Sequence, residues 1–377
     1  MGKQNTTVGC AVGGLGIGMA HVAGYLASED ARLVSVADAW DARRVRVGGT
    51  FEQGSMLNLR PLFDERVLAD TWQELGVRVC EDVREIVADD EVELVSLCTP
   101  DDTHEEYAVA LLDAGKHLLL EKPVALTLKS AARIGEAARR NGCRLAVGYE
   151  MRINPVVQKV RELVESGALG EIHAFTLQQF RKPFRRDKWQ RWIQSKKRSG
   201  GLLVEETCHW FDLARYITGK EVARVHCVGT DRILPDFDYE DIAFVQGWYD
   251  DGSVFQIGHS LTGFDFSLVI QAHGTAGTAW CGLKGEPRSL LDAGQTDYIG
   301  VVSWGPVDGG DGVQSVTFGN EAREGENIRD QVQHVVHALA GESGFPAEFD
   351  DGVAALAVAL AARRSLESEE VEEVYGR

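Results

Sequence analysis

Two residues in the second half of the chain have the types and spacing of an acid–base pair. Glu205 and His209 lie four positions apart in residues 201–218, whose apolar spacing predicts a helix. Positions i and i+4 share one helix face, so the carboxylate can orient the imidazole and stabilise its protonated form. We predict that His209 is a general base and that Glu205 assists it. A Glu–His pair on a helix face without chemical use is the plainer alternative.

Lys122 is the second group that could handle a proton. It follows a predicted strand, 117–120, and stands between Glu121 and Pro123. A lysine ammonium can hold an alcohol oxygen as charge develops on it and relay its proton. A base and a cation of this kind suit hydride removal from a secondary alcohol carbon. The alternative is a surface lysine paired with Glu121.

A glycine-rich stretch, residues 8–21 (VGCAVGGLGIGMAH), predicts a strand, a tight turn and a helix start. Glycine permits φ > 0 and a close ligand approach, and the helix N-terminus offers free N–H groups to a phosphate. The spacing departs from GxGxxG, because Leu15 stands where the middle glycine falls. The predicted cofactor-binding residues of this turn are Gly13, Gly14, Leu15, Gly16, Ile17 and Gly18.

Asp38 ends the next predicted strand and lies 20 residues after Gly18. A dinucleotide-binding fold places an acid at this distance on the adenosine ribose hydroxyls. The carboxylate would repel a 2′-phosphate, which favours NAD as the cofactor. Arg43 and Arg44 follow closely and could accommodate NADP, so the sequence leaves that cofactor open.

Composition excludes several classes of function. The formal net charge of −19 over 377 residues argues against nucleic acid as a partner. No run approaches 18 apolar residues, so we expect no membrane span. The seven cysteines form no CxxC pair and the N-terminus resembles no signal peptide, which favours reduced thiols in the cytoplasm. We expect no metal site, since no cluster of ligands accompanies Cys208 and His209.

The elements that must position these groups alternate between strand and helix over residues 1–148. This alternation predicts an α/β fold with a parallel sheet, which binds ligands at the carboxyl ends of its strands. The glycine turn, Asp38, Thr99-Pro100 and Glu121-Lys122-Pro123 all follow predicted strands. We therefore expect residues 1–148 to form a Rossmann dinucleotide-binding domain.

A strand-rich pattern over residues 222–318 predicts an open, mostly antiparallel sheet of about six to eight strands, with a hairpin turn at Asp251-Gly252. We expect residues 149–340 to bind substrate and mediate oligomerisation, and residues 341–377 to return to the first domain. An open sheet leaves edges and an apolar face to cover, so we expect a homodimer or a homotetramer.

Several motifs, taken in order, resemble the glucose–fructose oxidoreductase and inositol dehydrogenase family (Gfo/Idh/MocA). These are the glycine turn, VELVSLCTPDDTH, AGKHLLLEKPVALT, GYEMRINP, SGALGEI and GGLLVEETCHWFDLARY. The resemblance covers nearly the whole chain, and EKP with TP about 22 residues before it is its most specific part. It implies a Rossmann domain, a C-terminal α/β domain with a large open sheet, and NAD(P)-dependent chemistry at a sugar or cyclitol hydroxyl carbon.

The same resemblance suggests roles for further residues. It places Thr99 and Pro100 along the nicotinamide ribose and makes Lys122 the catalytic lysine, with a cis peptide bond before Pro123. It brings Arg152 and Asn154 into the substrate pocket, although both also fit helix capping. We also count Glu121, Lys122 and His104 with the cofactor-binding residues, although His104 fits helix packing as well. The family usually has aspartate and glycine where this chain has Glu205 and Thr207.

The segment 181–198 departs most from the acidic character of the chain. It contains nine Lys or Arg residues and one acid, interleaved with aromatic side chains. It is either a subunit-contacting or solvated loop, or a lid for an anionic sugar held by guanidinium groups and a stacked indole ring. The lid hypothesis assigns substrate contacts to Arg185, Trp189 and Trp192.

These observations predict an NAD(P)-dependent oxidoreductase that acts on a sugar, a cyclitol or a derivative, which could be anionic. Lys122 and His209 would handle the proton of the substrate hydroxyl, and Glu205 would assist them. Lys122 and His209 would also contact the substrate. Two alternatives use the same scaffold: a glycoside hydrolase or lyase that uses NAD transiently, and a non-catalytic NAD(P)-sensing regulator.

Overall fold

The computed structural model describes residues 7–52, 59–183, 191–264, 266–284, 299–341 and 343–375. The chain divides into two compact units, and each is described by itself below. The first comprises Met1–Glu150 and Glu324–Gly352, and the second comprises Met151–Arg323 and Val353–Arg377.

The first unit is built on a six-stranded parallel sheet with the order β3-β2-β1-β4-β5-β6. Apart from the edge strand β3 and the first residues of β2 and β5, these strands are buried. Burial on both faces suits their runs of small and β-branched residues. The strands are β1 (Val8–Gly13), β2 (Ala31–Ala37), β3 (Arg78–Cys80), β4 (Leu94–Leu97), β5 (His117–Leu120) and β6 (Leu145–Val147).

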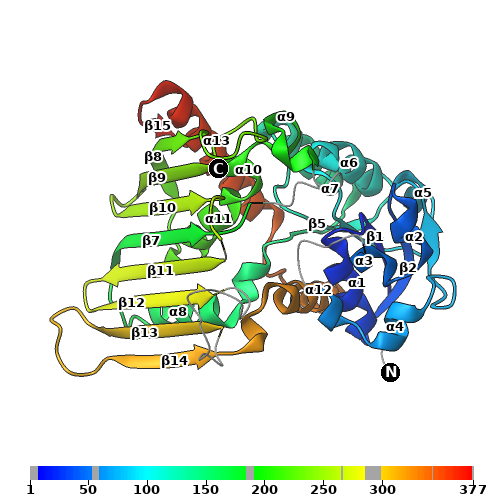
Figure 1. The fold of residues 1–377 in the computed structure, drawn as a ribbon, viewed down its shortest axis with the longest axis horizontal. Coiled ribbons are helices and arrows are strands. Elements are labelled where there is room, and N and C mark those ends of the chain that lie inside the picture. The colour runs from blue at the N-terminus through cyan, green and yellow to red at the C-terminus, as the bar shows by residue number, and fades with distance from the viewer. Residues whose placement is uncertain are drawn as a thin grey trace. The chain divides into compact units, whose positions relative to one another are not determined.

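Helices cover this sheet. Helix α1 packs on the sheet and against α12, while α6 packs on β4 and β5 and against α7 (Figure 1). An added Cβ at Gly24 of α1 would lie 2.6 Å from Val332 of α12, so glycine allows this close helix contact. The helices of the first unit are α1 (Gly18–Ala27), α2 (Asp41–Val45), α3 (Gly49–Glu52), α4 (Glu65–Ala69), α5 (Arg84–Val87), α6 (His104–Asp113), α7 (Leu128–Asn141) and α12 (Glu324–Gly341), with the 3₁₀ turns η1 (Arg60–Leu62) and η2 (Asp101–Thr103).

The second unit is built on a nine-stranded sheet with the order β14-β13-β12-β11-β7-β10-β9-β8-β15 in the described part of the chain. Strands β7 to β14 form the broad ladder from green to orange in Figure 1, and the short β15 is red. All neighbouring pairs are antiparallel except β7 and β10. The strands are β7 (Ile172–Phe180), β8 (Val222–Thr230), β9 (Ile242–Tyr249), β10 (Val254–Ser260), β11 (Ser267–Gly274), β12 (Gly277–Lys284), β13 (Gly300–Pro306), β14 (Gln314–Phe318) and β15 (Glu372–Glu373).

One face of this sheet is covered by helices. Helix α8 packs on β12 and β13, and α11 packs on β7 and β10. Burial alternates along β7, β9, β11 and β12, as expected for a sheet with one covered face. The helices of this unit are α8 (Pro155–Glu165), α9 (Lys196–Ser199), α10 (Leu202–Glu205), α11 (Thr207–Thr218) and α13 (Phe349–Ser368), with the 3₁₀ turns η4 (Arg191–Gln194) and η6 (Asn320–Ala322); η3 (Glu150–Ile153) lies where the units meet in sequence.

The predicted fold class is confirmed: a parallel Rossmann sheet precedes a large, mostly antiparallel sheet. The predicted hairpin is also confirmed, since Asp251-Gly252 joins β9 to β10 and Gly252 has φ +85°. The prediction of six to eight strands over residues 222–318 is confirmed, since the described residues there form seven, β8 to β14. The sheet also includes β7, which pairs in parallel with β10, and β15. Strand β15 escaped prediction because it is only two residues long and follows α13.

The predicted single helix over 201–218 is wrong, because α10 ends at Glu205 and α11 begins at Thr207. The hydroxyl of Thr207 donates to the carbonyl of Leu202 at 2.9 Å, and side-chain bonds of this kind compete with a continuous helix. At the C-terminus, α12 counts with the first unit and most of α13 with the second, a division that differs from the predicted boundaries. Every helix in the described ranges is too short or too polar to span a bilayer.

Candidate active site

The glycine turn between β1 and α1 leaves no room for side chains at two positions. Gly14 has φ +92°, and a Cβ there would lie 2.4 Å from the carbonyl oxygen of Cys98. A Cβ on Gly18 would lie 2.8 Å from Val12. The turn therefore requires glycine, and the first N–H groups of α1 with the positive end of its dipole adjoin it. This geometry fits a bound phosphate.

Leu15 explains how the turn tolerates its irregular spacing. Its side chain is fully buried within the hydrophobic core of the first unit. Its backbone N–H donates to Asp38 Oδ2 at 2.7 Å. A residue whose side chain lies in the core does not obstruct a ligand over the turn, so the middle glycine of the usual motif is dispensable here.

Asp38, at the end of β2, holds several groups at once. Oδ1 accepts from the N–H of Trp40 at 2.9 Å, and Oδ2 accepts from Arg43 at 3.1 Å in addition to Leu15. The nearest atom to a Cβ built on Gly16 is a guanidinium nitrogen of Arg43, at 3.7 Å. Arg44 donates to the carbonyl of Asp38 at 2.7 Å. An acid and a guanidinium group thus stand together beside the glycine turn.

The segment after β4 is tied to the segment after β5 by His104. Its Nδ1 lies 2.8 Å from the carbonyl oxygen of Pro123, and its Nε2 lies 3.0 Å from that of Thr99. Thr103 also bonds to Thr99 and to the carbonyl of Pro100. His104 is fully buried, which favours the packing role over direct cofactor contact. Burial lowers the pKa of His104, against the two backbone bonds, which raise it.

Glu121, Lys122 and Pro123 follow β5, and the expected cis peptide bond between Lys122 and Pro123 is confirmed. Glu121 Oε2 accepts from the backbone N–H of Lys122 at 3.2 Å, and Oε1 lies 3.0 Å from Nε2 of His21. A Cβ on Gly148, just after β6, would lie 2.7 Å from Glu121 Oε1. Glu121 is therefore enclosed, while Lys122 is half-buried.

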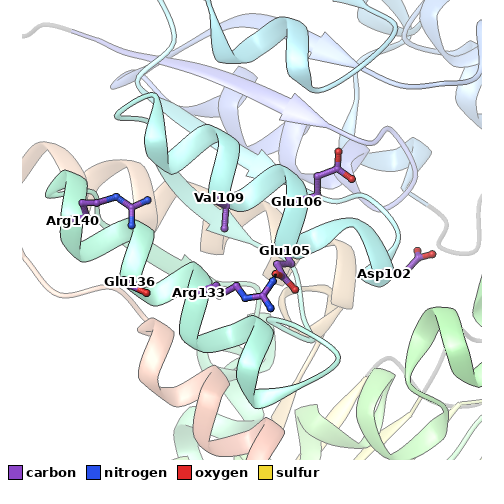
Figure 2. Close-up of a pocket in the computed structure, with 7 residues that line it drawn as sticks. All are labelled: Asp102, Glu105, Glu106, Val109, Arg133, Glu136 and Arg140. Atoms are coloured by element: carbon purple, nitrogen blue, oxygen red, sulfur yellow. Dashed lines mark hydrogen bonds and ion pairs between the residues drawn. The ribbon is translucent and has the colours of Figure 1, made fainter.

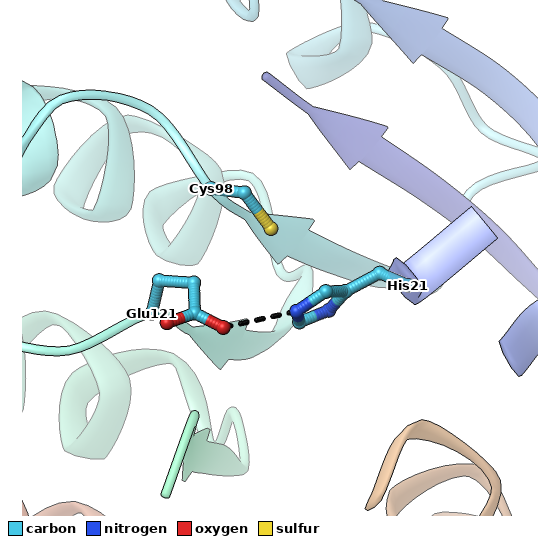
Figure 3. Close-up of side chains that lie close together, drawn as sticks. All are labelled: His21, Cys98 and Glu121. Carbon is cyan, nitrogen blue, oxygen red and sulfur yellow. Dashed lines mark hydrogen bonds and ion pairs between the residues drawn. The ribbon is translucent and has the colours of Figure 1, made fainter. Parts of the chain in front are cut away.

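His21, Cys98 and Glu121 form the tightest cluster of metal-ligand types in the described residues, with ligand atoms within 4.8 Å of one another. Figure 3 shows the imidazole of His21 aimed at the carboxylate of Glu121, with Cys98 beside them. A metal ion would have to part the 3.0 Å hydrogen bond between His21 and Glu121. Burial and the charge of Glu121 also raise the pKa of Cys98, which disfavours the thiolate that binds metals. We assign no metal to this cluster.

Glu150 is a buried carboxyl group near Lys122 that the sequence analysis did not single out. It follows β6 and is 6% exposed. Burial, then the charges of Glu324 and Glu121, raise the pKa of Glu150 well above its usual range, while Lys122 lowers it. The sequence signal was its position after a short buried strand, like that of Glu121.

In the second unit, the break between α10 and α11 separates Glu205 from His209 on the chain. Glu205 is the last residue of α10, and His209 lies in the first turn of α11. Both are buried, at 5% and 8% exposure. The ring of His209 lies 5.7 Å from that of Trp210, whose indole N–H donates to Gln179 at 2.9 Å. The acid–base role of the pair stays a prediction.

A neighbouring polar group around Glu206 also escaped the sequence analysis. Arg181 donates to Glu206 Oε2 at 2.6 Å, and Nε2 of His259 lies 4.0 Å from the same oxygen. Nδ1 of His259 is 2.9 Å from the hydroxyl of Thr207. Arg181 follows β7, Glu206 and Thr207 lie at the start of α11, and His259 belongs to β10, so only the folded sheet reveals them as neighbours.

Tyr239 marks the electrostatic character of this region. Burial, followed by the charges of Glu205 and Glu206, raises the pKa of Tyr239. The neutral phenol donates to the carbonyl of Ile193 at 2.7 Å. The side chains around α10 and α11 therefore combine several carboxylates with two imidazoles in a largely buried setting.

Arg152 and Asn154 make structural bonds in the second unit. Arg152 forms a two-pronged ion pair with Asp212, at 2.8 and 2.6 Å, and its guanidinium lies over the ring of Tyr216. Asn154 caps α8 by accepting from Val156 and donates to the carbonyl of Ala322. These contacts favour the capping and packing alternative, and a substrate contact by either residue stays a prediction.

The basic segment is described only in part. Arg185 and Trp189 lie outside the described residues, with Phe184 and Arg186, so the lid hypothesis stays a prediction. Trp192 lies in η4 and is half-buried. Lys196, at the start of α9, pairs with Glu367 at 3.0 Å.

A hollow of about 610 Å³ lies on the surface of the first unit, between α6 and α7. Figure 2 shows charged side chains around it, and Arg133 pairs with Glu105 across the two helices. Its lining contains none of the predicted site residues, so we regard it as a helix–helix seam. It is lined by Asp102, Glu105, Glu106, Val109, Arg133, Glu136 and Arg140.

The fold and the glycine turn define a dinucleotide-binding Rossmann domain followed by a second α/β domain. Comparison with known families agrees: residues 8–149 match the oxidoreductase family with an NAD-binding Rossmann fold, and residues 157–280 match the GFO/IDH/MocA C-terminal domain. The chain belongs to the Gfo/Idh/MocA family of oxidoreductases.

Individual relatives cover most of the chain. It is similar to myo-inositol 2-dehydrogenase of Thermotoga maritima, with 27% identity over 318 residues, 82% of this chain and 89% of that protein. It is 25% identical to inositol 2-dehydrogenase of Rhizobium meliloti over 356 residues, 93% and 94% of the two chains. A scyllo-inositol dehydrogenase structure from Lactobacillus casei, with NAD(H) and scyllo-inositol bound, has a TM-score of 0.73 at 19% identity and covers 98% of this chain and 100% of its own.

The raised pKa of Glu150 predicts a pH-dependent effect of removing its charge. The native state favours the protonated carboxyl of Glu150. Its contribution to the free energy of unfolding is therefore complete below the pKa of the unfolded state and is lost as pH rises through the pKa of the folded state. We expect the free energy of unfolding of Glu150→Gln, minus that of the wild type, to grow between pH 5 and pH 8. Urea unfolding at the two pH values measures this difference.

Glu74→Gln is the matched control in the same unit. Glu74 is exposed, and hydrogen bonds from Thr71 lower its pKa, so it stays ionised across this interval. Its difference from the wild type should be constant between pH 5 and pH 8. A constant or shrinking difference for Glu150→Gln would contradict the assignment of a buried, protonated carboxyl.

Proposed function

We propose that this protein is an NAD(P)-dependent dehydrogenase that oxidises or reduces a secondary hydroxyl or keto carbon of a sugar, cyclitol or derivative. The observation that carries the proposal is Lys122, half-buried at the carboxyl end of β5 with its neighbours Glu121 and Pro123 held by buried groups. Ligands bind at this edge of a Rossmann sheet. The inositol dehydrogenases among the relatives support the substrate class.

The chain's own residues would divide the work as follows. The N–H groups around Gly14 and Gly18 would hold the cofactor pyrophosphate, and Asp38 would bind the adenosine ribose. Bound cofactor accepts or supplies the hydride. Lys122 would hold the alcohol oxygen as charge develops, and His209 would take its proton with Glu205 assisting.

We propose NAD as the preferred cofactor, with NADP also accepted. Asp38 would repel a 2′-phosphate, but Arg43 lies 3.1 Å from its carboxylate and could bind that phosphate instead. Two opposed charges beside the glycine turn therefore set the preference.

Asp38→Ser should shift the preference toward NADP. Removing the acid leaves Arg43 to face a 2′-phosphate, so kcat/KM for NADP⁺ relative to NAD⁺ should rise by about tenfold, or about 1.4 kcal/mol. Asp41→Ser is the control, since it removes the same charge from an exposed residue that pairs with Arg44 instead. Equal shifts in both variants would show a general charge effect and sink the proposal for Asp38.

Lys122 and His209 can be tested by an NADH-absorbance screen. The panel contains free sugars, inositols, sugar acids and sugar phosphates, so that it also covers anionic substrates. On any compound turned over by the wild type, Lys122→Met and His209→Asn should each lose about 10²–10⁴ in kcat. Lys129→Met, on an exposed position of α7, should keep wild-type activity.

Other outcomes of this screen would contradict the proposal. Wild-type rates in Lys122→Met would refute the role of the lysine. Glycoside cleavage with solvent isotope exchange and no net NADH would indicate a hydrolase or lyase. NADH binding without turnover of any compound would indicate a regulator.

We also propose that a second copy of this chain covers the open face of the nine-stranded sheet. The residues directly paired across β8, β9 and β10 lie on one face, and Val228, Phe244 and Val254 there are 53%, 45% and 42% exposed. Trp280 of β12 lies on the same face at 39% exposure. In a twofold dimer, an exposed apolar face can pack against the same face of the second copy and so be removed from water.

Light scattering at micromolar concentration should give two or four times the mass of one chain. Phe244→Lys should lower that mass, because it places a charge within the buried contact. A wild-type mass equal to one chain would contradict the assembly.

A further inference from the structure

Lys122 lies between two residues that are each bound to a fully buried histidine. Glu121 is bound by His21, and Pro123 is bound by His104. Both imidazoles are 0% exposed. One histidine therefore contacts the residue before Lys122, and the other contacts the residue after it. Both ring nitrogens of each histidine have polar contacts, so neither side chain serves only to fill the hydrophobic core.

The bonds around His21 form a chain with a defined direction. The carboxylate of Glu121 only accepts, so Nε2 of His21 donates to it at 3.0 Å. In the neutral ring Nδ1 accepts from the hydroxyl of Ser96 at 2.9 Å, which leaves Ser96 to accept from Tyr25 at 2.6 Å. Every member is satisfied when the imidazole is neutral. The chain fixes the tautomer and the ring of His21, and thereby the carboxylate of Glu121.

The fixed orientation of the Glu121 carboxylate also restricts the backbone of Lys122. Its second oxygen accepts from the backbone N–H of Lys122 at 3.2 Å. Gly148 closes the other side, since any Cβ there would lie 2.7 Å from the carboxylate. The carboxylate has little freedom, so the peptide that begins Lys122 has little freedom either.

His104 acts on the other flank. Both of its nitrogens face carbonyl oxygens, of Pro123 at 2.8 Å and of Thr99 at 3.0 Å, and carbonyls only accept. The neutral imidazole carries one N–H, so His104 donates to one of these two carbonyls. Donation to Pro123 holds the carbonyl of the residue after Lys122, in the peptide between Pro123 and Val124, and keeps the ring beside Thr99 just after β4. The segments after β4 and β5 are thus joined through one side chain.

We propose that His21 and His104 are positioning residues that together fix the direction of the Lys122 side chain. Neither touches the reacting atoms; His21 orients the carboxylate that accepts from the backbone N–H of Lys122, and His104 holds the carbonyl of the following residue, Pro123. A displacement of about 1 Å at a reacting group can cost about 10²-fold in rate, so a brace on both flanks has a measurable consequence. The inference rests on the proposed role of Lys122.

The test measures kcat, KM and the chemical labelling of Lys122 in the full-length protein. Labelling uses trinitrobenzenesulfonate, and peptide mass spectrometry follows Lys122 with Lys129 as the internal reference. His21→Leu and His104→Leu should each lower kcat by about 10²-fold with little change in KM for NAD⁺, since the glycine turn is untouched. The labelling rate of Lys122 relative to Lys129 should change several-fold in both.

Conservative variants separate positioning from simple destabilisation. His21→Gln keeps an N–H donor for Glu121, so kcat and Lys122 labelling should recover to within about threefold of wild type. Ser96→Ala removes the partner of Nδ1 of His21, together with the acceptor of the Tyr25 hydroxyl, and should give an intermediate loss of kcat. His117→Leu is the matched control: this half-buried histidine begins β5 and accepts from the N–H of Arg144, at the opposite end of the strand. It should leave kcat and labelling unchanged.

The proposal is overturned if folded His21→Leu and His104→Leu behave like His117→Leu. It is also overturned if His21→Gln is as impaired as His21→Leu, which would show a role in packing only. If the leucine variants do not fold, Ser96→Ala and His21→Gln decide by the same criteria. If no compound is turned over, the proposed function fails, while the labelling comparison still decides whether the histidines position Lys122.

Discussion

The burial of the Glu121 carboxylate is the constraint on which the candidate site depends. An ionised group with so little exposure needs a donor of matching geometry, and His21 supplies it at 3.0 Å. The hydrogen bonds continue from His21 to Ser96 and Tyr25 in the interior, and Glu121 also accepts from the backbone N–H of Lys122. The parallel sheet makes the arrangement possible, because the carboxyl ends of β4, β5 and β6 lie side by side at one edge. A single buried charge thus links the interior of the first unit to the residue proposed to act on substrate.

The same edge explains how the glycine turn and Asp38 belong to one site. Asp38 directly follows β2, and its carboxylate accepts from the backbone N–H of Leu15 in the turn that follows β1. The acid that we propose to bind the ribose therefore also shapes the turn, with Arg43 as its counter-charge. The proposed cofactor preference and the shape of the turn therefore depend on the same side chain.

Much of this was predictable from sequence because it is local. The strand–turn–helix of residues 8–21, the alternation that follows and the hairpin at Asp251-Gly252 all depend on nearby residues. The cis bond before Pro123 was expected from the resemblance to known proteins. The middle glycine was the exception: Leu15 is tolerated because its side chain lies in the core, which no local pattern reveals.

Contacts between distant parts of the chain escaped the sequence analysis. His21 meets Glu121 across 100 positions, and Arg152 meets Asp212 across 60. The break at Glu206 depends on Thr207, whose hydroxyl bonds the backbone of Leu202 and faces His259 of β10. The apolar periodicity predicted one helix over residues 201–218, but it carries no information on contacts with a residue of β10 far along the chain. Glu150 was overlooked for a similar reason, since its setting depends on Glu121 and Glu324.

The central claim is that Lys122 and His209 act on one hydroxyl group of a bound polyol. A crystal structure of the protein with NADH and myo-inositol tests it most directly. The account predicts that the lysine Nζ and one ring nitrogen of His209 both lie within hydrogen-bond distance of the same substrate oxygen, with the adjoining carbon facing the nicotinamide. A complex in which either side chain lies remote from that oxygen would contradict it.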